Sequence, residues 1–132
     1  MKIIPAGDDK KYWDEILKIR NENCFGFGNN KPINKKDHYC FMEKNYYDYF
    51  VYLDEVQNNT VAGFVGCVNN DIRIAIKNEY KRLGLAKDLI YFIKKKYPNS
   101  FAKVKSDNIP SLKLFESCGF KKTWYVLEKI ND

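Results

Sequence analysis

The sequence has no long apolar run: nowhere does it approach the roughly 18 uncharged apolar residues that a membrane-spanning helix requires. Its first residues do not read as a secretory leader, because the stretch 1–7 is short and two aspartates, Asp8 and Asp9, follow at once. We therefore expect a cytoplasmic protein that has no membrane partner.

Cysteine and histidine are scarce, with four cysteines and one histidine in 132 residues. The cysteines lack the paired spacing of disulfide frameworks or metal sites, so we expect reduced thiols, mostly in apolar surroundings, and no metal. None of them pairs with His38 in a recognisable pattern, and we expect no covalent enzyme intermediate.

Internal repeats, low-complexity tracts and linkers are also missing, so residues 1–132 are expected to form one domain. Hydrophobic residues make up 45% of the chain and aromatic residues 16%, which is enough to build a stable core. The composition therefore excludes a disordered chain.

The chain is basic, with a formal net charge of +6, and lysines are concentrated between residues 77 and 105. This charge implies an anionic partner such as nucleic acid, a phosphorylated cofactor or an acidic surface. No recognition-helix or RNA-binding pattern accompanies it, so we do not expect nucleic acid. A solvated lysine face remains the alternative.

Hydrophobic periodicity predicts a succession of short strands and helices. The predicted strands are Lys2–Pro5, Tyr47–Val56, Val61–Val68, Asp71–Lys77, Ser100–Lys105 and Trp124–Ile130. The predicted helices run from Asp8 or Asp9 to about Asn21, from Asn34 or Asp37 to Lys44, from Gly84 to Tyr97 and from Asn108 to Ser117. This order predicts an α/β fold, a mixed central sheet flanked by about four helices.

The turn before the long helix carries the clearest chemical signal. Gly84 and Ala86 are small where the backbone enters the helix, and the first N–H groups of a helix have no internal partner. These groups lie at the positive end of the helix dipole, and Lys81 and Arg82 add formal charge. The turn is therefore a candidate pyrophosphate site, although a glycine at a helix start is common in any fold.

Two stretches resemble the GNAT superfamily of acetyl-CoA-dependent N-acetyltransferases. Asp71–Ile76 with Glu79–Ala86 is similar to that family's strand, turn and helix, and Asn108–Phe120 is similar to its second motif. One departure is Lys81, where the family has Gln or Arg. The likeness covers about residues 61–120, and it implies a GNAT-like fold with acetyl-CoA as co-substrate.

The resemblance implies a set of positions that bind the cofactor. They are Ile74, Ala75, Ile76, Lys81, Arg82, Leu83, Gly84, Leu85, Ala86, Lys87, Asn108, Ser111 and Phe115. Main-chain groups of Ile74 and Ile76 should pair with the pantetheine arm. Asn108 matches a cofactor-contacting position, but it is also placed to cap a helix.

Acetyl transfer to an amine needs a base, and relatives supply an acid as well. Asp71 matches the strand position where many relatives carry Glu, although it is also an ordinary turn residue, and Glu79 is a second candidate. Many relatives use a Tyr as the acid at the position of Phe115, which cannot donate a proton. Water, or a tyrosine from elsewhere such as Tyr125, would have to replace it.

Arg20, Asn21 and His38 resemble the acceptor-side pattern of the sugar-nucleotide N-acetyltransferases of the pseudaminic acid pathway. The resemblance favours a 4-amino-sugar nucleotide as the small-molecule acceptor, ahead of a peptide, polyamine or antibiotic amine. His38 could equally be a surface residue or a cap. A non-catalytic acyl-CoA sensor is the rival function, and a homodimer could complete a pocket left open by the short stretch after Phe120.

Overall fold

The computed structural model describes residues 1–23 and 31–131. Its strands are β1 (Lys2–Pro5), β2 (Tyr49–Asp54), β3 (Thr60–Val68) and β4 (Asp71–Ile76). Its longer helices are α1 (Lys11–Glu22), α2 (Lys35–Asn45), α3 (Leu85–Lys96) and α4 (Ile109–Ser117). Short 3-10 turns precede or follow the strands at η1 (Ala6–Asp8), η3 (Tyr46–Asp48), η4 (Glu55–Gln57) and η5 (Asn78–Tyr80).

The four strands form one antiparallel sheet in the order β1-β2-β3-β4. The β3–β4 hairpin turns at Asn69 and Asn70, whose φ angles are 54° and 65°. Positive φ at both central residues is the turn that matches the twist of a tight hairpin, and asparagine tolerates it better than most side chains. This confirms the three consecutive strands that the sequence predicts between residues 47 and 77.

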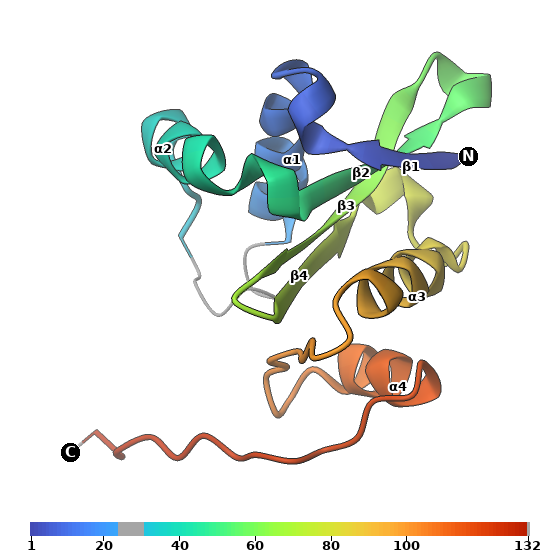
Figure 1. Cartoon of the computed structure of the whole chain (residues 1–132). Helices are drawn as coiled ribbons and strands as arrows, with labels where there is room; N and C mark the ends of the chain where they lie inside the picture. Colours follow the sequence, from blue (N-terminus) through green and yellow to red (C-terminus); the bar gives the residue numbers. More distant parts are fainter. Residues whose placement is uncertain (24–30, 132) are drawn as a thin grey trace.

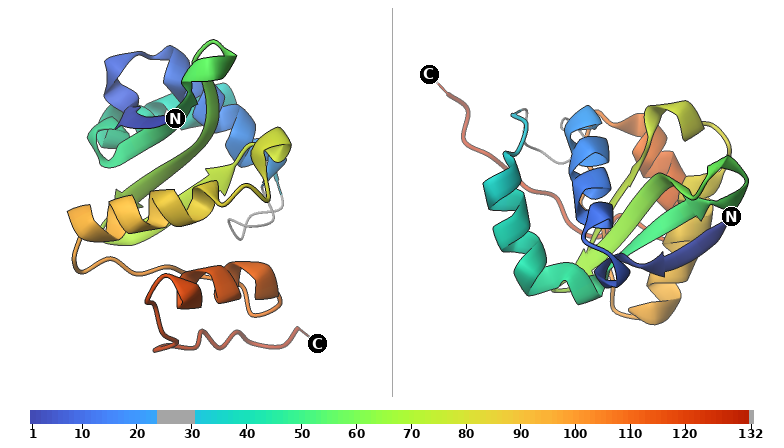
Figure 2. Two further views of the ribbon diagram at one scale, coloured as in Figure 1. Left: turned by 90° about the vertical axis from the view of Figure 1, so that its right-hand side faces the viewer. Right: turned by 90° about the horizontal axis from the view of Figure 1, so that it is seen from above.

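Helices cover both faces of the sheet (Figures 1 and 2), with α1 and α2 on one side and α3 on the other. The alternation of β4 divides its side chains between the two layers: Ile72 and Ile76 pack with α3, whereas Ala75 packs with α1. The α3 face is the predicted one, because Leu85, Leu89, Ile90 and Ile93 are all buried. The sheet is therefore sandwiched, and β4 borders both layers.

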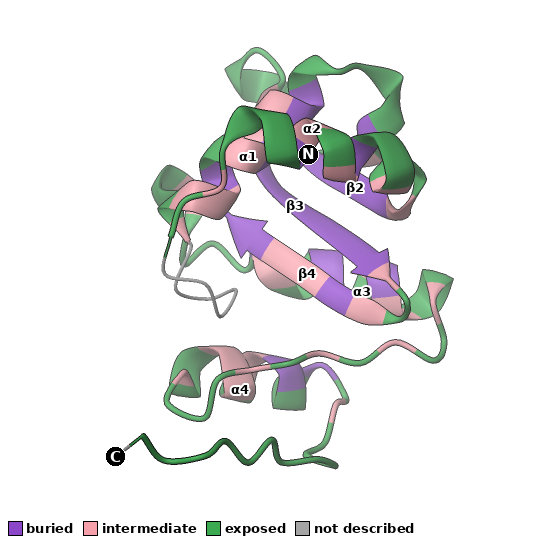
Figure 3. Ribbon diagram, turned by 90° about the vertical axis from the view of Figure 1, so that its left-hand side faces the viewer, coloured by how far each residue is buried: buried purple, intermediate pink, exposed green. Residues whose placement is uncertain are grey.

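The C-terminal quarter differs from the sequence expectation. Ser100–Lys105 makes only one isolated parallel bridge, between Phe101 and Asp71, and Trp124–Ile130 forms no strand. Residues 121–131 run outside the layers and are exposed along their length (Figures 1 and 3). A strand needs backbone partners, and β-forming side chains alone do not supply them. Within the described residues the sheet is thus antiparallel, with parallel pairing limited to the Phe101 bridge.

Two local predictions about α2 and the thiols have different outcomes. Asn34 caps α2, since its side chain accepts a hydrogen bond from the Asp37 N–H. Of the thiols, Cys67 and Cys118 are buried, in agreement with the expected apolar surroundings, whereas Cys40 on α2 is exposed. Across residues 1–23 and 31–131, no helix has the length and apolarity to cross a membrane.

Candidate functional site

One edge of β4 is paired with β3 and the other is largely open. Along β4, the odd-numbered residues, such as Arg73 and Ala75, point their main-chain N–H and C=O groups toward β3. The hydrogen bond of 2.8 Å from the Lys77 N–H to the Ala62 carbonyl fixes this direction. On the opposite edge, the Ile72 N–H donates to the Phe101 carbonyl at 2.8 Å. Ladder pairing on that edge stops there within the part of the chain that the structure describes.

The main-chain groups of Ile74 and Ile76 therefore face the open edge, because successive residues of a strand point their N–H and C=O groups to alternate sides. The Ile76 carbonyl accepts a hydrogen bond of 3.3 Å from the Asn23 side chain, which agrees with this direction. The backbone of Ala75 instead faces β3, so this predicted cofactor contact can only be made by its side chain. The open edge is suited to an extended, amide-containing ligand.

The turn from Lys81 to Gly84 leaves main-chain groups accessible to a ligand. Arg82 and Gly84 both have positive φ, 68° and 78°, and a Cβ built on Gly84 would meet no atom within 4 Å. No side chain caps the N-terminus of α3. The first N–H groups of α3 therefore open onto free space, which is the arrangement that binds a phosphate group.

The side chains around this turn are divided between solvent and core. The side chains of Lys81, Arg82, Leu83 and Lys87 are exposed. Leu85 is buried in the core between α3 and the sheet. Leu85 can therefore contribute its backbone, but not its side chain, to a ligand at the turn. Ala86, half-buried beside it, adds only a methyl group at the start of the helix.

The second motif starts α4. The Asn108 side chain accepts a hydrogen bond of 3.2 Å from the Ser111 N–H, so it caps the helix as the alternative interpretation held. Phe115 is buried and meets Phe120 edge to face, with ring centroids 5.3 Å apart. Phe115 thus fills the core, and α4 offers no phenol at that position.

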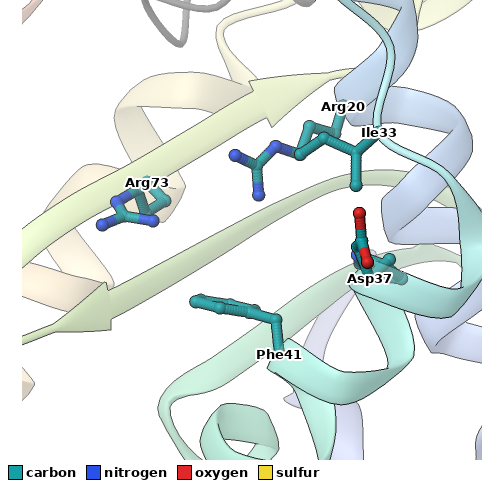
Figure 4. A pocket seen from close by; sticks show the side chains of 6 residues that line it. Arg20, Ile33, Asp37, Phe41 and Arg73 are labelled. Carbon is teal, nitrogen blue, oxygen red and sulfur yellow. The ribbon is translucent and has the colours of Figure 1, made fainter.

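A pocket of about 270 Å³ lies on the α1 and α2 side of the sheet (Figure 4). Its lining residues are Arg20, Ile33, Asp37, His38, Phe41 and Arg73. They come from α1, the segment before α2, α2 itself and β4. Two of the predicted acceptor residues, Arg20 and His38, are therefore brought together, and β4 joins their pocket to the open edge.

Asn21, the third predicted acceptor residue, does not line this pocket. Its side chain donates to the Ile33 carbonyl at 3.1 Å and accepts from the Ile33 N–H at 2.9 Å. Both ends of the amide are used to hold residue 33 against α1. Asn21 therefore positions one wall of the pocket.

His38 is buried, with 2% of its surface exposed. Its Nε2 lies 2.7 Å from the Trp13 carbonyl oxygen, which can only accept, so Nε2 carries the proton and donates. Burial lowers the pKa of His38, the bond to Trp13 opposes this, and the charge of Arg20 lowers the pKa further. Nδ1 is thus a lone-pair acceptor, and it has no hydrogen-bond partner among the described residues.

Arg73 links the pocket to the sheet beneath it. Its guanidinium charge acts on the hydroxyl of Tyr49: burial raises the pKa of Tyr49, and the charges of Arg73 and Arg20 oppose that rise. The ring of Tyr49 fits because residue 66 is glycine: a Cβ there would lie 2.5 Å from the ring. Arg73 therefore lies within the electrostatic reach of a buried phenol.

Asp71, the leading candidate base, lies beside Arg73. Its Oδ2 is 3.6 Å from Arg73 Nη2 and 3.8 Å from Lys103 Nζ, and its side chain is 15% exposed. The carboxylate is thus held between two cations at the start of β4, next to the pocket and to the bridge at Phe101.

The other two catalytic candidates are not brought to this place. Glu79 follows the far end of β4, about 17 Å along a six-residue strand from Asp71. It is exposed and lies 3.7 Å from Lys77 Nζ. Tyr125 is 81% exposed on the segment after α4. Neither geometry supports a role beside Asp71.

Sequence reasoning missed Arg73, Asp37, Ile33 and Phe41 as pocket residues. A signal for Arg73 was available, because it is the only charged side chain inside the strand 72–76 and stands opposite the isoleucine face. The other three depend on how α2 packs over the sheet. Across the described residues there is no cluster of His, Cys, Asp or Glu that could hold a metal.

The site combines an open strand edge, an uncapped helix turn and a small polar pocket on one strand. This combination suits a group-transfer protein that holds an extended anionic donor. A family profile described as the Acetyltransferase (GNAT) family matches residues 13–120. The chain belongs to this family, and it is accordingly an acetyltransferase.

Solved structures with the same fold agree. A ribosomal-protein-alanine N-acetyltransferase from Brucella melitensis superposes with a TM-score of 0.79 at 15% identity, covering 94% of this chain and 86% of that one. A spermidine N-acetyltransferase from Vibrio cholerae, in complex with CoA and spermine, gives 0.76 at 19% identity, covering 98% and 86%. AAC(6')-Iy, bound to a CoA bisubstrate analogue, gives 0.73 at 16% identity, covering 99% and 97%. No curated protein sequence matches the chain significantly.

Proposed function

We propose that the protein transfers the acetyl group of acetyl-CoA to a primary amine of a small acceptor. The observation that carries this proposal is the uncapped start of α3 at Gly84, which comes after the strand with the open edge and the short turn η5. The turn would hold the pyrophosphate through backbone N–H groups, and Ile74 and Ile76 would pair with the amide-rich arm. Acetyl-CoA supplies an activated thioester.

The residues beside the open edge have distinct roles in this proposal. Asp71 would accept a proton from the acceptor's ammonium, directly or through water, since only the free amine attacks. The β4 backbone would place the reacting carbon, and the amine would attack it without a covalent enzyme intermediate. Because Phe115 has no hydroxyl, water would protonate the departing thiolate.

The acceptor pocket favours a 4-amino-sugar nucleotide as its occupant, by the likeness of Arg20 and His38 to the acceptor side of sugar-nucleotide N-acetyltransferases. Peptides, polyamines and antibiotic amines are the alternatives, because proteins of the same fold include a ribosomal-protein-alanine and a spermidine N-acetyltransferase. A non-catalytic acyl-CoA sensor is the rival function, and Phe115 is the observation that favours it.

The test has two measurements on the full chain. Calorimetry with coenzyme A should show one tight site, and thiol release from acetyl-CoA should then depend on an added amine from a panel of amino sugars, their nucleotides, polyamines and peptides. Tight coenzyme binding without turnover on any amine would establish the sensor. Failure to bind the coenzyme would overturn both the acetyltransferase and the sensor function.

A further inference from the structure

Two arginines line the acceptor pocket. Arg20 comes from α1 and Arg73 from β4, and Figure 4 shows both side chains bordering one space together with Asp37 and Phe41. Burial lowers the pKa of Arg20, the charge of Tyr49 opposes this, and the charge of Arg73 lowers the pKa further. Like charges in such a place repel each other unless an anion lies between them.

The carboxylates nearby do not balance these cations. Asp71 is shared between Arg73 and Lys103, at 3.6 and 3.8 Å. Asp37 also lines the pocket, and its Oδ2 accepts a hydrogen bond of 3.1 Å from Asn34. Of the charged side chains that line the pocket, two are arginines and one is a carboxylate, so the lining carries a net positive charge.

His38 adds a different kind of contact. Its ring is 98% buried (2% exposed), it lines the pocket, and its Nδ1 lone pair has no partner within residues 1–23 and 31–131. Burial lowers the pKa of His38 below its ordinary 6.5, so at neutral pH the ring is neutral, keeps its proton on the Nε2 that donates to Trp13, and adds no charge to the pocket. A buried acceptor of this kind is satisfied by a donor on a ligand or a bound water.

The pocket's size limits what can enter. Its volume of about 270 Å³ lies just below the range of about 300–1,000 Å³ typical of ligand sites. It can hold one ring or a short chain with its charged group. Guanidinium forks bind carboxylates and phosphates through paired N–H groups, which a lysine cannot reproduce.

On the basis of the proposed acetyl transfer, we infer that the acceptor is a small amine bearing an anionic group, a phosphate or a carboxylate, which Arg73 and Arg20 bind. An N–H or O–H group of the same molecule donates to Nδ1 of His38. The anionic group fixes the acceptor at the inner side of β4, so that its amine reaches Asp71 and the open edge.

The test compares acceptors that differ only in the anion. One pair is glucosamine and glucosamine 6-phosphate, and the other is β-alaninamide and β-alanine. With the full chain and saturating acetyl-CoA, the anionic member of at least one pair should have a kcat/KM at least tenfold higher, and this preference should weaken as salt is raised. The pair that shows the larger preference distinguishes phosphate from carboxylate.

Three variants locate the preference. Arg73→Gln should abolish it, Arg73→Lys should keep only part of it because the fork is lost, and the exposed control Lys44→Gln should leave it unchanged. His38→Gln keeps a donor for the Trp13 carbonyl but loses the Nδ1 lone pair, so it should raise KM several-fold for both members of a pair. Coenzyme A binding in every variant verifies that the fold is intact.

Each outcome is decisive. Turnover with equal kcat/KM within both pairs, or a preference that survives Arg73→Gln, would overturn the inference while leaving acetyl transfer in place. Absence of turnover with every amine, despite coenzyme binding, would overturn the proposed function and the inference with it. A preference lost only in the Arg73 variants would support it.

Discussion

The two sides of β4 use different parts of the polypeptide. Along its open edge and at the turn to α3, the groups that face outward are main-chain N–H and C=O groups around Ile74, Ile76 and Gly84. On the α1 and α2 face, the pocket is lined by charged and polar side chains such as Arg20, His38 and Arg73. One side is therefore defined by backbone conformation and the other by side-chain chemistry.

The difference indicates how each side can vary. Main-chain groups are present whatever the side chain is, so the edge and the turn require only small residues and the correct φ angles. The pocket depends on particular side chains from separate elements, so substitutions in α1, α2 or β4 can change its ligand without altering the edge. Substitutions should therefore affect donor binding or acceptor use, but seldom both.

The largest expected effect is on the side-chain face, at Asp71. If its carboxylate takes the proton from the amine, Asp71→Asn should lower kcat by about 10²–10⁴-fold, with little change in coenzyme A affinity. Steady-state thiol release measures this.

Two variants separate catalysis from the ion pairs around Asp71. Lys103→Gln removes one ion pair but keeps the carboxylate, and should lower kcat only slightly because that lysine is exposed. Glu79→Gln, at the other end of β4, should leave kcat unchanged. A kcat for Asp71→Asn within a factor of three of the wild type would remove Asp71 from the mechanism.

On the main-chain side, Gly84→Val should weaken coenzyme A binding by about 30-fold or more. The side chain would stand where the pyrophosphate approaches, and two or more charge-assisted hydrogen bonds would be lost or lengthened. Calorimetric titration with coenzyme A measures this change.

Gly119 offers a matched control, since its φ of 92° is also positive and a Cβ there would meet only the flexible end of Lys94. Gly119→Val and Gly84→Val should each lower the free energy of unfolding by a similar amount, about 1–2 kcal/mol. Gly119→Val should leave coenzyme affinity nearly unchanged. Equal loss of affinity in both variants would mean that backbone strain, not the turn itself, weakens binding.

The same contrast explains which features could be predicted from the sequence. The candidate cofactor turn is contiguous, so the small residues Gly84 and Ala86, together with the family resemblance, were enough to single it out, and periodicity predicted the helix that follows. The pocket could be predicted only in part. Arg20 and His38 came from a resemblance, but Arg73 joins them only through the packing of α1 and α2 over β4.

The predicted C-terminal strands show the limit of β propensity. The segment 124–130 has the aromatic and β-branched side chains typical of strands, yet Trp124 is 90% exposed and the segment is unpaired in the described chain. A strand forms when another backbone offers its hydrogen bonds, and a single sequence does not specify that partner. For Phe101, one bridge to Asp71 is all that forms.

A smaller effect is expected from the pH dependence of stability on the pocket side. Burial lowers the pKa of His38 from its ordinary 6.5, so the unfolded chain takes up a proton before the folded protein does. The contribution of His38 is therefore complete above about pH 6.5 and is lost as the pH falls from there toward the lowered folded pKa. Urea unfolding at pH 8, 6.5 and 5 measures the free energy of unfolding in this window.

His38→Gln is the matched variant, because its amide can still donate to the Trp13 carbonyl but does not titrate. Its free energy of unfolding should fall less between pH 6.5 and 5 than that of the wild type. Parallel curves for the two proteins would show that His38 is not the group responsible. Coenzyme affinity should not follow this titration, since the turn at Gly84 contains no histidine.

The smallest effect is expected at Tyr125, which belongs to neither side of β4. Its side chain is 81% exposed, and its hydroxyl makes no recorded hydrogen bond in the described chain, so removing that hydroxyl should leave the free energy of unfolding within about 0.5 kcal/mol of the wild type. Tyr125→Phe should also have the kcat of the wild type, because Phe115 cannot donate a proton and water would protonate the thiolate. A kcat reduced tenfold or more at unchanged stability would place this tyrosine at the thioester, and the segment 124–130 would then have to lie along the open edge during turnover.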